Sequence, residues 1–219
     1  LPTPGVSEIS AATVGPGRAH HFQDGREFAA IGPTLYEIDG AGTMTSRGTV
    51  GTDNRPATIT TNGDVGNQLF ITSNRNGFYY NLSTNVLTQI TALNGLAFQG
   101  AYLDGYFLNL DDQTSTLYIS ALADGSSWTL TDSSQRSIGS DPFVSMIVCG
   151  RLLWLLGELT SEVWYNTADT FPFSPHPAGY LNFGIAAQWS RVVNGANVMW
   201  LATSRTGRLS VVQASGFNP

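Results

Sequence analysis

Short apolar runs separated by turn residues make up most of this chain, and the pattern is clearest from Asp141 to Phe173. The runs there are Phe143–Cys149, Leu152–Leu156 and Glu162–Tyr165. Each run is too short for a stable helix and is rich in β-branched and aromatic residues, so each predicts a strand. Gly150 and Gly157 provide the turns between them. The stretch therefore predicts a three-strand meander, with a fourth short strand possible around Phe171–Ser174.

The same arrangement recurs along the chain. The second strands of successive repeats read EFAAI, QLFIT, YFLNL, LLWLL and VMWLA, and the third strands read TLYEI, FYYNL, TLYIS, EVWYN and RLSVV. Aromatic residues recur near the middle of both columns, and the period is roughly 36 to 45 residues, which is typical of β-propeller repeats. Each blade of a propeller buries its two faces only against its neighbours. A β-sandwich or barrel with coincidental spacing is the alternative.

The other repeats contain strands of similar length between turn residues such as Asp24-Gly25, Asn62-Gly63 and Asp104-Gly105. The expected strands are Glu27–Ile31, Thr34–Ile38, Met44–Val50, Ala57–Thr61, Gln68–Thr72, Phe78–Asn81, Val86–Thr91, Leu96–Leu103, Tyr106–Leu110, Thr116–Ser120, Trp128–Thr131, Ala186–Val193, Val198–Ala202 and Arg208–Gln213. These elements predict an all-β fold and no helix longer than about two turns.

We therefore predict a β-propeller of about five consecutive four-stranded blades that is part of a larger propeller. Residues 1–17 are expected to form an extended N-terminal arm or a partial blade. The blades are expected at 18–219, approximately at 18–52, 53–93, 94–135, 136–183 and 184–219. The chain begins without Met and ends in Gly-Phe-Asn-Pro, so we also expect it to be a piece of a longer protein.

Composition narrows the classes of function. Charged residues make up 12% of the chain, about half the usual share, so Ser, Thr, Asn, Gln and Gly must cover most of the surface. The net charge is −6, and all ten basic residues are arginine. An acidic chain without lysine is a poor non-specific binder of nucleic acid, because phosphate contacts need a basic patch. No apolar stretch approaches the roughly 18 residues that a membrane-spanning helix needs.

The positions of the cysteine and the histidines do not suggest a metal site or a reactive thiol. Cys149 is the only cysteine and lies in an apolar run, which predicts a small buried hydrophobe and rules out a disulfide framework. His20 and His21 are adjacent and His176 lies far away between prolines, so no spacing suits a zinc site. We predict no catalytic, cofactor-binding or metal-binding residues and no cofactor.

Acidic residues offer no convincing catalytic pair. Asp111 and Asp112 are adjacent in a polar loop and are expected to be solvated, with their side chains on opposite faces. Glu158 and Glu162 flank a hairpin turn, where they could pair with Arg151 at the surface for at most about 1 kcal/mol.

One polar turn and several tryptophans need separate consideration. The sequence SALADGSSW at Ser120–Trp128 resembles an Asp-box turn of sialidase-type propellers, but its Asp and Gly are adjacent and the spacing is wrong by one. We expect a polar turn ended by a core tryptophan. The remaining tryptophans lie in or beside strand runs and are expected to pack in the core or between blades rather than to form a sugar platform. They are Trp154, Trp164, Trp189 and Trp200.

Several phrases together resemble the packaged-DNA stabilisation proteins, or tail accessory factors, of short-tailed bacteriophages. They are LPTPG at the start, NGFYYNLSTNVLTQIT, YLDGYFLNL, STLYISALADGSSW and, most specifically, the Leu-Trp-Leu-Leu-Gly and Thr-Ser-Glu-Val-Trp-Tyr-Asn-Thr phrases within Leu153–Phe173. The resemblance extends from about Leu1 to Phe217. It implies a structural virion protein of the phage tail hub or head-to-tail connector, which helps to form the tail tube and to retain packaged DNA.

The resemblance also implies partners. These are the portal and head–tail adaptor above, tail needle or fibre proteins below, and further copies of the protein in a ring, with DNA as passing cargo at most and no membrane. It brings no catalytic residues. Two alternatives stay open: a carbohydrate-binding or receptor-binding tail propeller, and a cellular scaffold propeller. The last is weakest, because the Gly-His and Trp-Asp dipeptides of WD repeats do not occur.

Overall fold

The computed structural model describes residues 15–63, 66–135, 138–204 and 206–215. These residues form five antiparallel sheets of four strands each, which confirms the all-β propeller. One 3₁₀ turn, η1 (Thr91–Leu93), is the longest helical element within this part of the chain. The expected arm at residues 1–17 lies outside the described residues except for its last three positions.

The first three blades are regular meanders in chain order. Blade one contains β1 (Gly17–Gln23), β2 (Arg26–Ile31), β3 (Thr34–Ile38) and β4 (Met44–Thr49). Blade two contains β5 (Thr58–Thr61), β6 (Gln68–Ser73), β7 (Asn76–Asn81) and β8 (Val86–Ile90). Blade three contains β9 (Gln99–Leu103), β10 (Tyr106–Asp111), β11 (Thr116–Ala121) and β12 (Asp124–Gln135). Most of these strands lie where the apolar runs predicted them.

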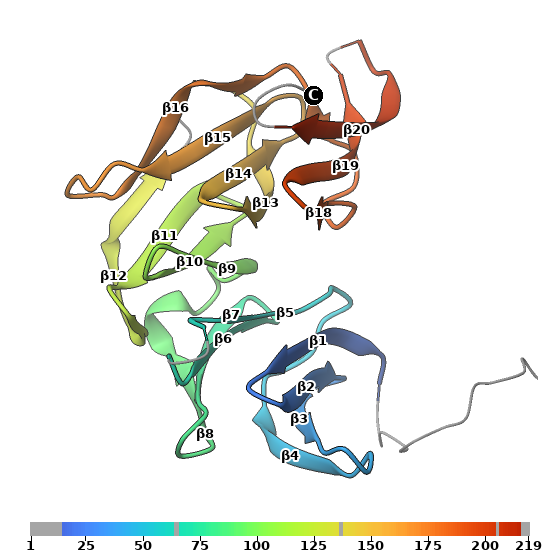
Figure 1. Cartoon of the computed structure of the whole chain (residues 1–219), viewed down its shortest axis with the longest axis vertical. Coiled ribbons are helices and arrows are strands. Elements are labelled where there is room, and N and C mark those ends of the chain that lie inside the picture. The colour runs from blue at the N-terminus through green and yellow to red at the C-terminus, as the bar shows by residue number, and fades with distance from the viewer. Residues whose placement is uncertain (1–14, 64–65, 136–137, 205, 216–219) are drawn as a thin grey trace, which may run out of the picture.

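The last two blades complete the series. Blade four contains β13 (Phe143–Cys149), β14 (Leu152–Gly157), β15 (Ser161–Asn166) and β16 (Phe173–Leu181). Blade five contains β17 (Gly184–Ile185), β18 (Val192–Asn194), β19 (Asn197–Thr203) and β20 (Leu209–Ser215). Figure 1 shows the five blades in an arc, with β1, β5, β9, β13 and β18 on its inner side. These inner strands contact one another from each blade to the next.

A separate apolar cluster fills each junction between successive blades. Phe28 and Leu35 of blade one pack with Leu69 and Ile71 of blade two. Corresponding clusters lie between blades two and three, three and four, and four and five. A single twisted sheet would leave both of its faces in water, so burial of apolar area favours stacking of blade on blade.

The two tryptophans of blade four show how one sheet serves two junctions. Trp154 pairs with Val163, and Trp164 pairs with Leu153, on adjacent strands. Successive strand residues face opposite sides of a sheet, so the two indoles point away from each other. Trp164 is 1% exposed in the cluster shared with blade three, and Trp154 is 2% exposed in the cluster shared with blade five. Both tryptophans thus pack between blades, which confirms the expectation that they pack in the core or between blades.

Two outer strands differ from the sequence prediction. β12 extends over Asp124–Gln135 rather than Trp128–Thr131. The sequence analysis missed its second half because that half is polar and exposed and shows no apolar run. β16 extends over Phe173–Leu181, well beyond the fourth strand expected at Phe171–Ser174. Its sequence contains two prolines and a glycine, which normally argue against a strand, but it is the outer edge of its blade and such residues are tolerated there.

The predicted strand Ala186–Val193 is wrong. The chain instead forms β17 and β18, which pair with different stretches of the same edge of β19. Between them, Ser190 closes a turn by donating from its backbone N and its hydroxyl to the carbonyl of Ala187 at 2.9 and 2.8 Å. β20 pairs with the opposite edge of β19, and its Leu209 and Val211 side chains are 65% and 71% exposed.

Candidate functional site

Buried polar contacts cross the blade junctions close to the inner strands. The inner strands carry polar side chains such as Arg18, Gln99 and Ser145, which bond across to the next blade. Because a buried polar group without a partner destabilises a fold, each of these contacts fixes the position of one blade relative to the next.

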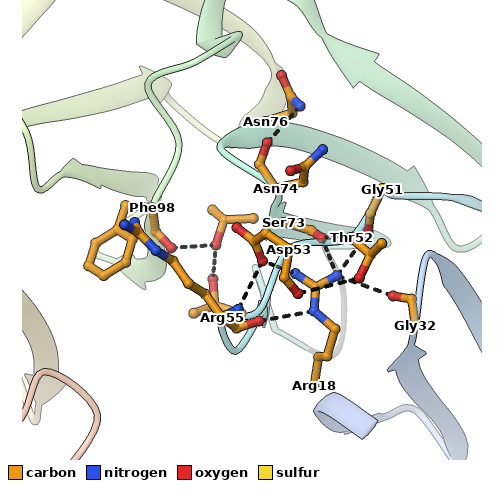
Figure 2. A network of polar contacts seen from close by, with 12 residues as sticks. Arg18, Gly32, Gly51, Thr52, Asp53, Arg55, Ser73, Asn74, Asn76 and Phe98 are labelled. Carbon is orange, nitrogen blue, oxygen red and sulfur yellow. Dashed lines mark hydrogen bonds and ion pairs between the residues drawn. The ribbon is translucent and has the colours of Figure 1, made fainter. Parts of the chain in front are cut away.

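Arg18 of β1 forms the largest contact (Figure 2). Its side chain is 3% exposed and reaches across the junction between blades one and two. The guanidinium donates to the carbonyls of Gly32, Gly51 and Arg55 at 3.2, 2.8 and 3.0 Å. It also donates to the Asp53 carboxylate at 2.8 Å and the Ser73 hydroxyl at 2.9 Å. We call these residues the Arg18 network.

The acidic pair Asp111-Asp112 contacts arginines across the next junction, and Asp112 also lies 3.5 Å from Arg55. Arg75, in the β6–β7 turn of blade two, bonds to both carboxylates, with a distance of 2.7 Å to Asp112. Asp111 is 1% exposed, so the expectation of two solvated acids on opposite faces is wrong. Arg75 has a positive φ of 58° within this tight turn. Burial lowers the pKa of Arg75, but the two carboxylates outweigh it and the pKa is raised.

Uncharged contacts connect blade three to blade four. The side-chain carbonyl of Gln99 in β9 accepts from the Met146 backbone N at 2.8 Å and from the Ser145 hydroxyl at 3.2 Å. The Ser145 hydroxyl also lies 2.7 Å from the Gln188 carbonyl of blade five. One buried hydroxyl on β13 therefore connects three blades.

Arg191 connects blades four and five. Its Nε donates to the Met146 carbonyl at 2.7 Å, and its Nη1 donates to the Gln188 carbonyl at 3.1 Å. The guanidinium lies 4.9 Å from the ring centre of Trp189, within the range of a cation–π contact. Burial lowers the pKa of Arg191 to about 10, so the side chain stays charged at neutral pH.

The pairing expected between Arg151 and the hairpin glutamates does not form. Arg151 bonds instead to Asp104 of blade three at 3.1 Å. Glu162 is fully buried and accepts from the backbone N atoms of Ile138 and Gly139 and from the Trp164 indole. The reason is strand register, since Glu162 points into the junction, where it holds the segment that leads into blade four.

The histidines and the cysteine lie apart. His20 lies 2.8 Å from Glu27, whereas the Nε2 atom of His21 is buried without a partner. Burial, and secondarily the charge of His20, lower the pKa of His21. His176 lies in blade four, and Cys149 is 8% exposed, as a small buried hydrophobe. Among the described residues, no three His, Cys, Asp or Glu side chains come together as a metal site.

The SALADGSSW turn and the tryptophans pack as expected. Asp124 accepts from the backbone N and the hydroxyl of Ser126 at 2.9 and 2.7 Å, and Trp128 is 9% exposed with its indole bonded to Gly125. Trp200 is 1% exposed. Trp189 is half-buried and packs edge-on against Phe98 at 5.5 Å.

Arginine is thus largely committed to internal contacts. Six of the arginines in the described ranges form ion pairs with carboxylates: Arg18, Arg26, Arg47, Arg55, Arg75 and Arg151. A guanidinium that already bonds to a carboxylate has fewer donors left for a phosphate. Sequence reasoning missed these contacts, although a chain whose basic residues are all arginine is a signal, since arginine suits bidentate and buried pairing better than lysine.

The fold has many similar structures of low sequence identity. A functionally unknown protein from Desulfotomaculum acetoxidans superposes with a TM-score of 0.60 at 10% identity, covering 92% of this chain and 72% of that one. PorZ, a bacterial surface component of the type-IX secretion system of Porphyromonas gingivalis, gives 0.57 at 12% identity and covers 94% of this chain. The tricorn protease gives 0.53 at 13% identity, covering 94%. The chain spans 28% of PorZ and 22% of the tricorn protease. These likenesses establish the fold alone.

The sequence itself identifies the family. No curated protein matches the chain. None of the helices in the described ranges has the length and hydropathy to cross a membrane. The family model described as Bacteriophage P22 Gp10, beta-propeller, matches residues 1–219. The chain belongs to this family of packaged-DNA stabilisation proteins and is a phage structural protein with a propeller fold.

Proposed function

We propose that this propeller is part of a phage tail hub or head-to-tail connector that helps to form the tail tube and to retain packaged DNA. The observation that carries the proposal is the match of the whole chain to the packaged-DNA stabilisation family. In this role the protein acts by assembly rather than by turnover and belongs to the tail of the virion. Its partners are the portal or adaptor above, needle or fibre proteins below, and copies of itself in a ring.

The structure supports a mechanical role in two ways. Every blade junction combines an apolar cluster with polar contacts, so the blades resist displacement relative to one another. The ion-paired arginines and the net charge of −6 leave little basic surface for phosphates. A surface of this kind lets DNA pass without gripping it, since non-specific affinity depends on free Lys and Arg.

A phage lacking the protein tests the proposal. Mutant particles are expected to fill with DNA and then to lose it, with tails that stop short in electron micrographs. Nuclease-resistant genome copies per head measure the loss. Two variants supplied in trans sharpen the assay: Arg18→Met, in the Arg18 network, and Arg208→Met, at an exposed position of blade five. Arg18→Met is expected to reduce DNA retention, and Arg208→Met to restore it.

The same experiment separates the alternatives. Particles that keep their DNA and only fail to attach to cells would favour a receptor-binding tail propeller and overturn the proposal. The purified protein is expected to hydrolyse neither glycans nor nucleotides. It should bind duplex DNA no more tightly than about 10⁻⁴ M at physiological salt, the weak limit of non-specific binding.

A further inference from the structure

We propose that a polar cluster on the inner side of the arc, where blades three, four and five meet, binds a carboxylate. The cluster surrounds Met146 of β13, and we call it the Arg191 site. Its polar groups come from Gln99 of blade three, Ser145 and Met146 of blade four, and Gln188 and Arg191 of blade five. The proposal is independent of the tail-hub role.

The backbone of Met146 holds the two main side chains of the site next to each other. Met146 stands opposite Leu155 in the sheet, but its backbone N donates to Gln99 at 2.8 Å and its carbonyl accepts from Arg191 at 2.7 Å. When a residue of an antiparallel pair takes no part in the ladder bonds, its N–H and C=O groups both point away from the partner strand. Gln99 and Arg191 therefore meet at the same inner edge of β13.

An interruption in blade five brings Arg191 to this edge. Residues 186–191 separate β17 from β18 and contain the turn that Ser190 closes. The guanidinium of Arg191 lies over the ring of Trp189, which packs in turn against Phe98 of blade three at 5.5 Å. These contacts fix the guanidinium before a ligand arrives, which lowers the entropy cost of binding.

The positive charge of Arg191 has no counter-charge in the described part of the chain. Six other arginines form ion pairs with carboxylates, whereas Arg191 bonds only to two backbone carbonyls. Its Nη2 atom bonds to none of the described residues and is not buried, so a ligand can reach it. Burial alone shifts the pKa of Arg191, while carboxylates raise that of Arg75. A largely buried charge of this kind favours a bound anion.

Gln99 gives an independent indication that an acceptor is missing. Its side chain is fully buried, and its Nε2 atom has no hydrogen-bond partner among the described residues. A flipped amide does not explain this, because the Met146 backbone N can only donate and therefore requires the Gln99 oxygen. The nearby Gln188 carbonyl is already used, since it accepts from both Ser145 and Arg191. The site thus has more donors than acceptors.

A carboxylate matches these donors in charge and in shape. One unpaired guanidinium requires one negative charge, whereas a phosphate group carries more than one at neutral pH and would leave an excess. The two oxygens of a carboxylate lie in one plane, as the guanidinium nitrogens do, so one can accept from Arg191 and the other from Gln99. Chloride has the correct charge but is a single atom and cannot serve both donors in this way.

Melting curves and calorimetry of the purified chain at constant ionic strength test the assignment. The probes are sodium acetate, sodium phosphate and sodium chloride. We expect acetate to bind with a Kd in the millimolar range or tighter, and at least about tenfold more tightly than phosphate or chloride. Acetate in tenfold excess over its Kd should raise the melting temperature by roughly 3–6 °C.

A peptide with blocked ends and a single glutamate distinguishes the possible sources of the carboxylate. If this peptide binds more tightly than acetate, the natural ligand is a side chain of another polypeptide. If it binds more weakly, the ligand is a small free carboxylate. The same peptide with glutamine in place of glutamate is the neutral control and should not bind.

Three variants locate the binding. Arg191→Met should abolish the response to acetate, while Arg208→Met removes an exposed arginine of blade five and should leave the response unchanged. Gln99→Glu places a carboxylate in the site, so this variant should melt no lower than the wild type and should not respond to acetate. It tests the proposal even if Arg191→Met fails to fold.

Four results would contradict the proposal. The first is no binding of acetate to the wild type, and the second is an equal response to phosphate or chloride. The third is a response to acetate that persists in Arg191→Met or in Gln99→Glu. The fourth is a loss of the response in Arg208→Met as large as that in Arg191→Met.

Discussion

Replacement of Arg18 by methionine tests the argument that polar contacts hold neighbouring blades in position. The change keeps most of the side-chain volume but removes the guanidinium, which leaves the Asp53 carboxylate and the carbonyls of Gly32, Gly51 and Arg55 without this donor. Removing one member of a buried charged pair costs about 3–5 kcal/mol. Asp53 is 26% exposed and can recover some hydration, so we expect the lower end, about 3 kcal/mol.

A urea titration followed by tryptophan fluorescence measures this loss. For a domain of this size, about 3 kcal/mol also corresponds to a fall of roughly 6–12 °C in melting temperature. Arg18→Lys should recover only part of the loss, because an ammonium cannot reach the five partners that the planar guanidinium spans. Arg208→Met is the control and should change the free energy of unfolding by less than about 0.5 kcal/mol. A cost below about 1 kcal/mol for Arg18→Met would refute the reasoning.

Three further changes test other parts of the structure. Trp154→Ala should cost about 3–5 kcal/mol in a denaturant titration, and a cost below about 1 kcal/mol would contradict its burial between blades. His21 has a lowered pKa, so the folded state binds fewer protons than the unfolded chain, and the free energy of unfolding should fall as the pH drops below about 6.5. Urea titrations of His21→Gln at several pH values should show a weaker dependence of the free energy of unfolding on pH. Gly179→Ala should cost about 1–3 kcal/mol by overpacking against Val163, and an unchanged melting temperature would contradict the close approach there.

The sequence predicted most strands because burial on both faces of a blade leaves a strong apolar pattern. It failed at β16, where the expected strand ended at Ser174, just before Pro175 and Pro177, since only the pairing with β15 shows that this edge tolerates prolines. It also failed at residues 186–191, where the predicted strand Ala186–Val193 is interrupted by the turn between Ala187 and Ser190. In these places tertiary pairing outweighed local pattern.

The polar contacts between blades were beyond sequence reasoning for another reason. Arg18 bonds to residues up to 55 positions away, and Arg75 reaches carboxylates 36 and 37 positions away. No local spacing encodes such a pair, because it depends on how one blade stacks on the next.

The free edge of β20 has a consequence for any preparation of this chain. Its backbone donors and acceptors on that side have no sheet partner in the described residues, and the neighbouring Leu209 and Val211 side chains stand in water. Such an edge is a template on which a strand of another molecule can add. This chain should therefore self-associate as its concentration rises. The Val211→Lys variant should stay monomeric, because it places a charge where the incoming strand would pack.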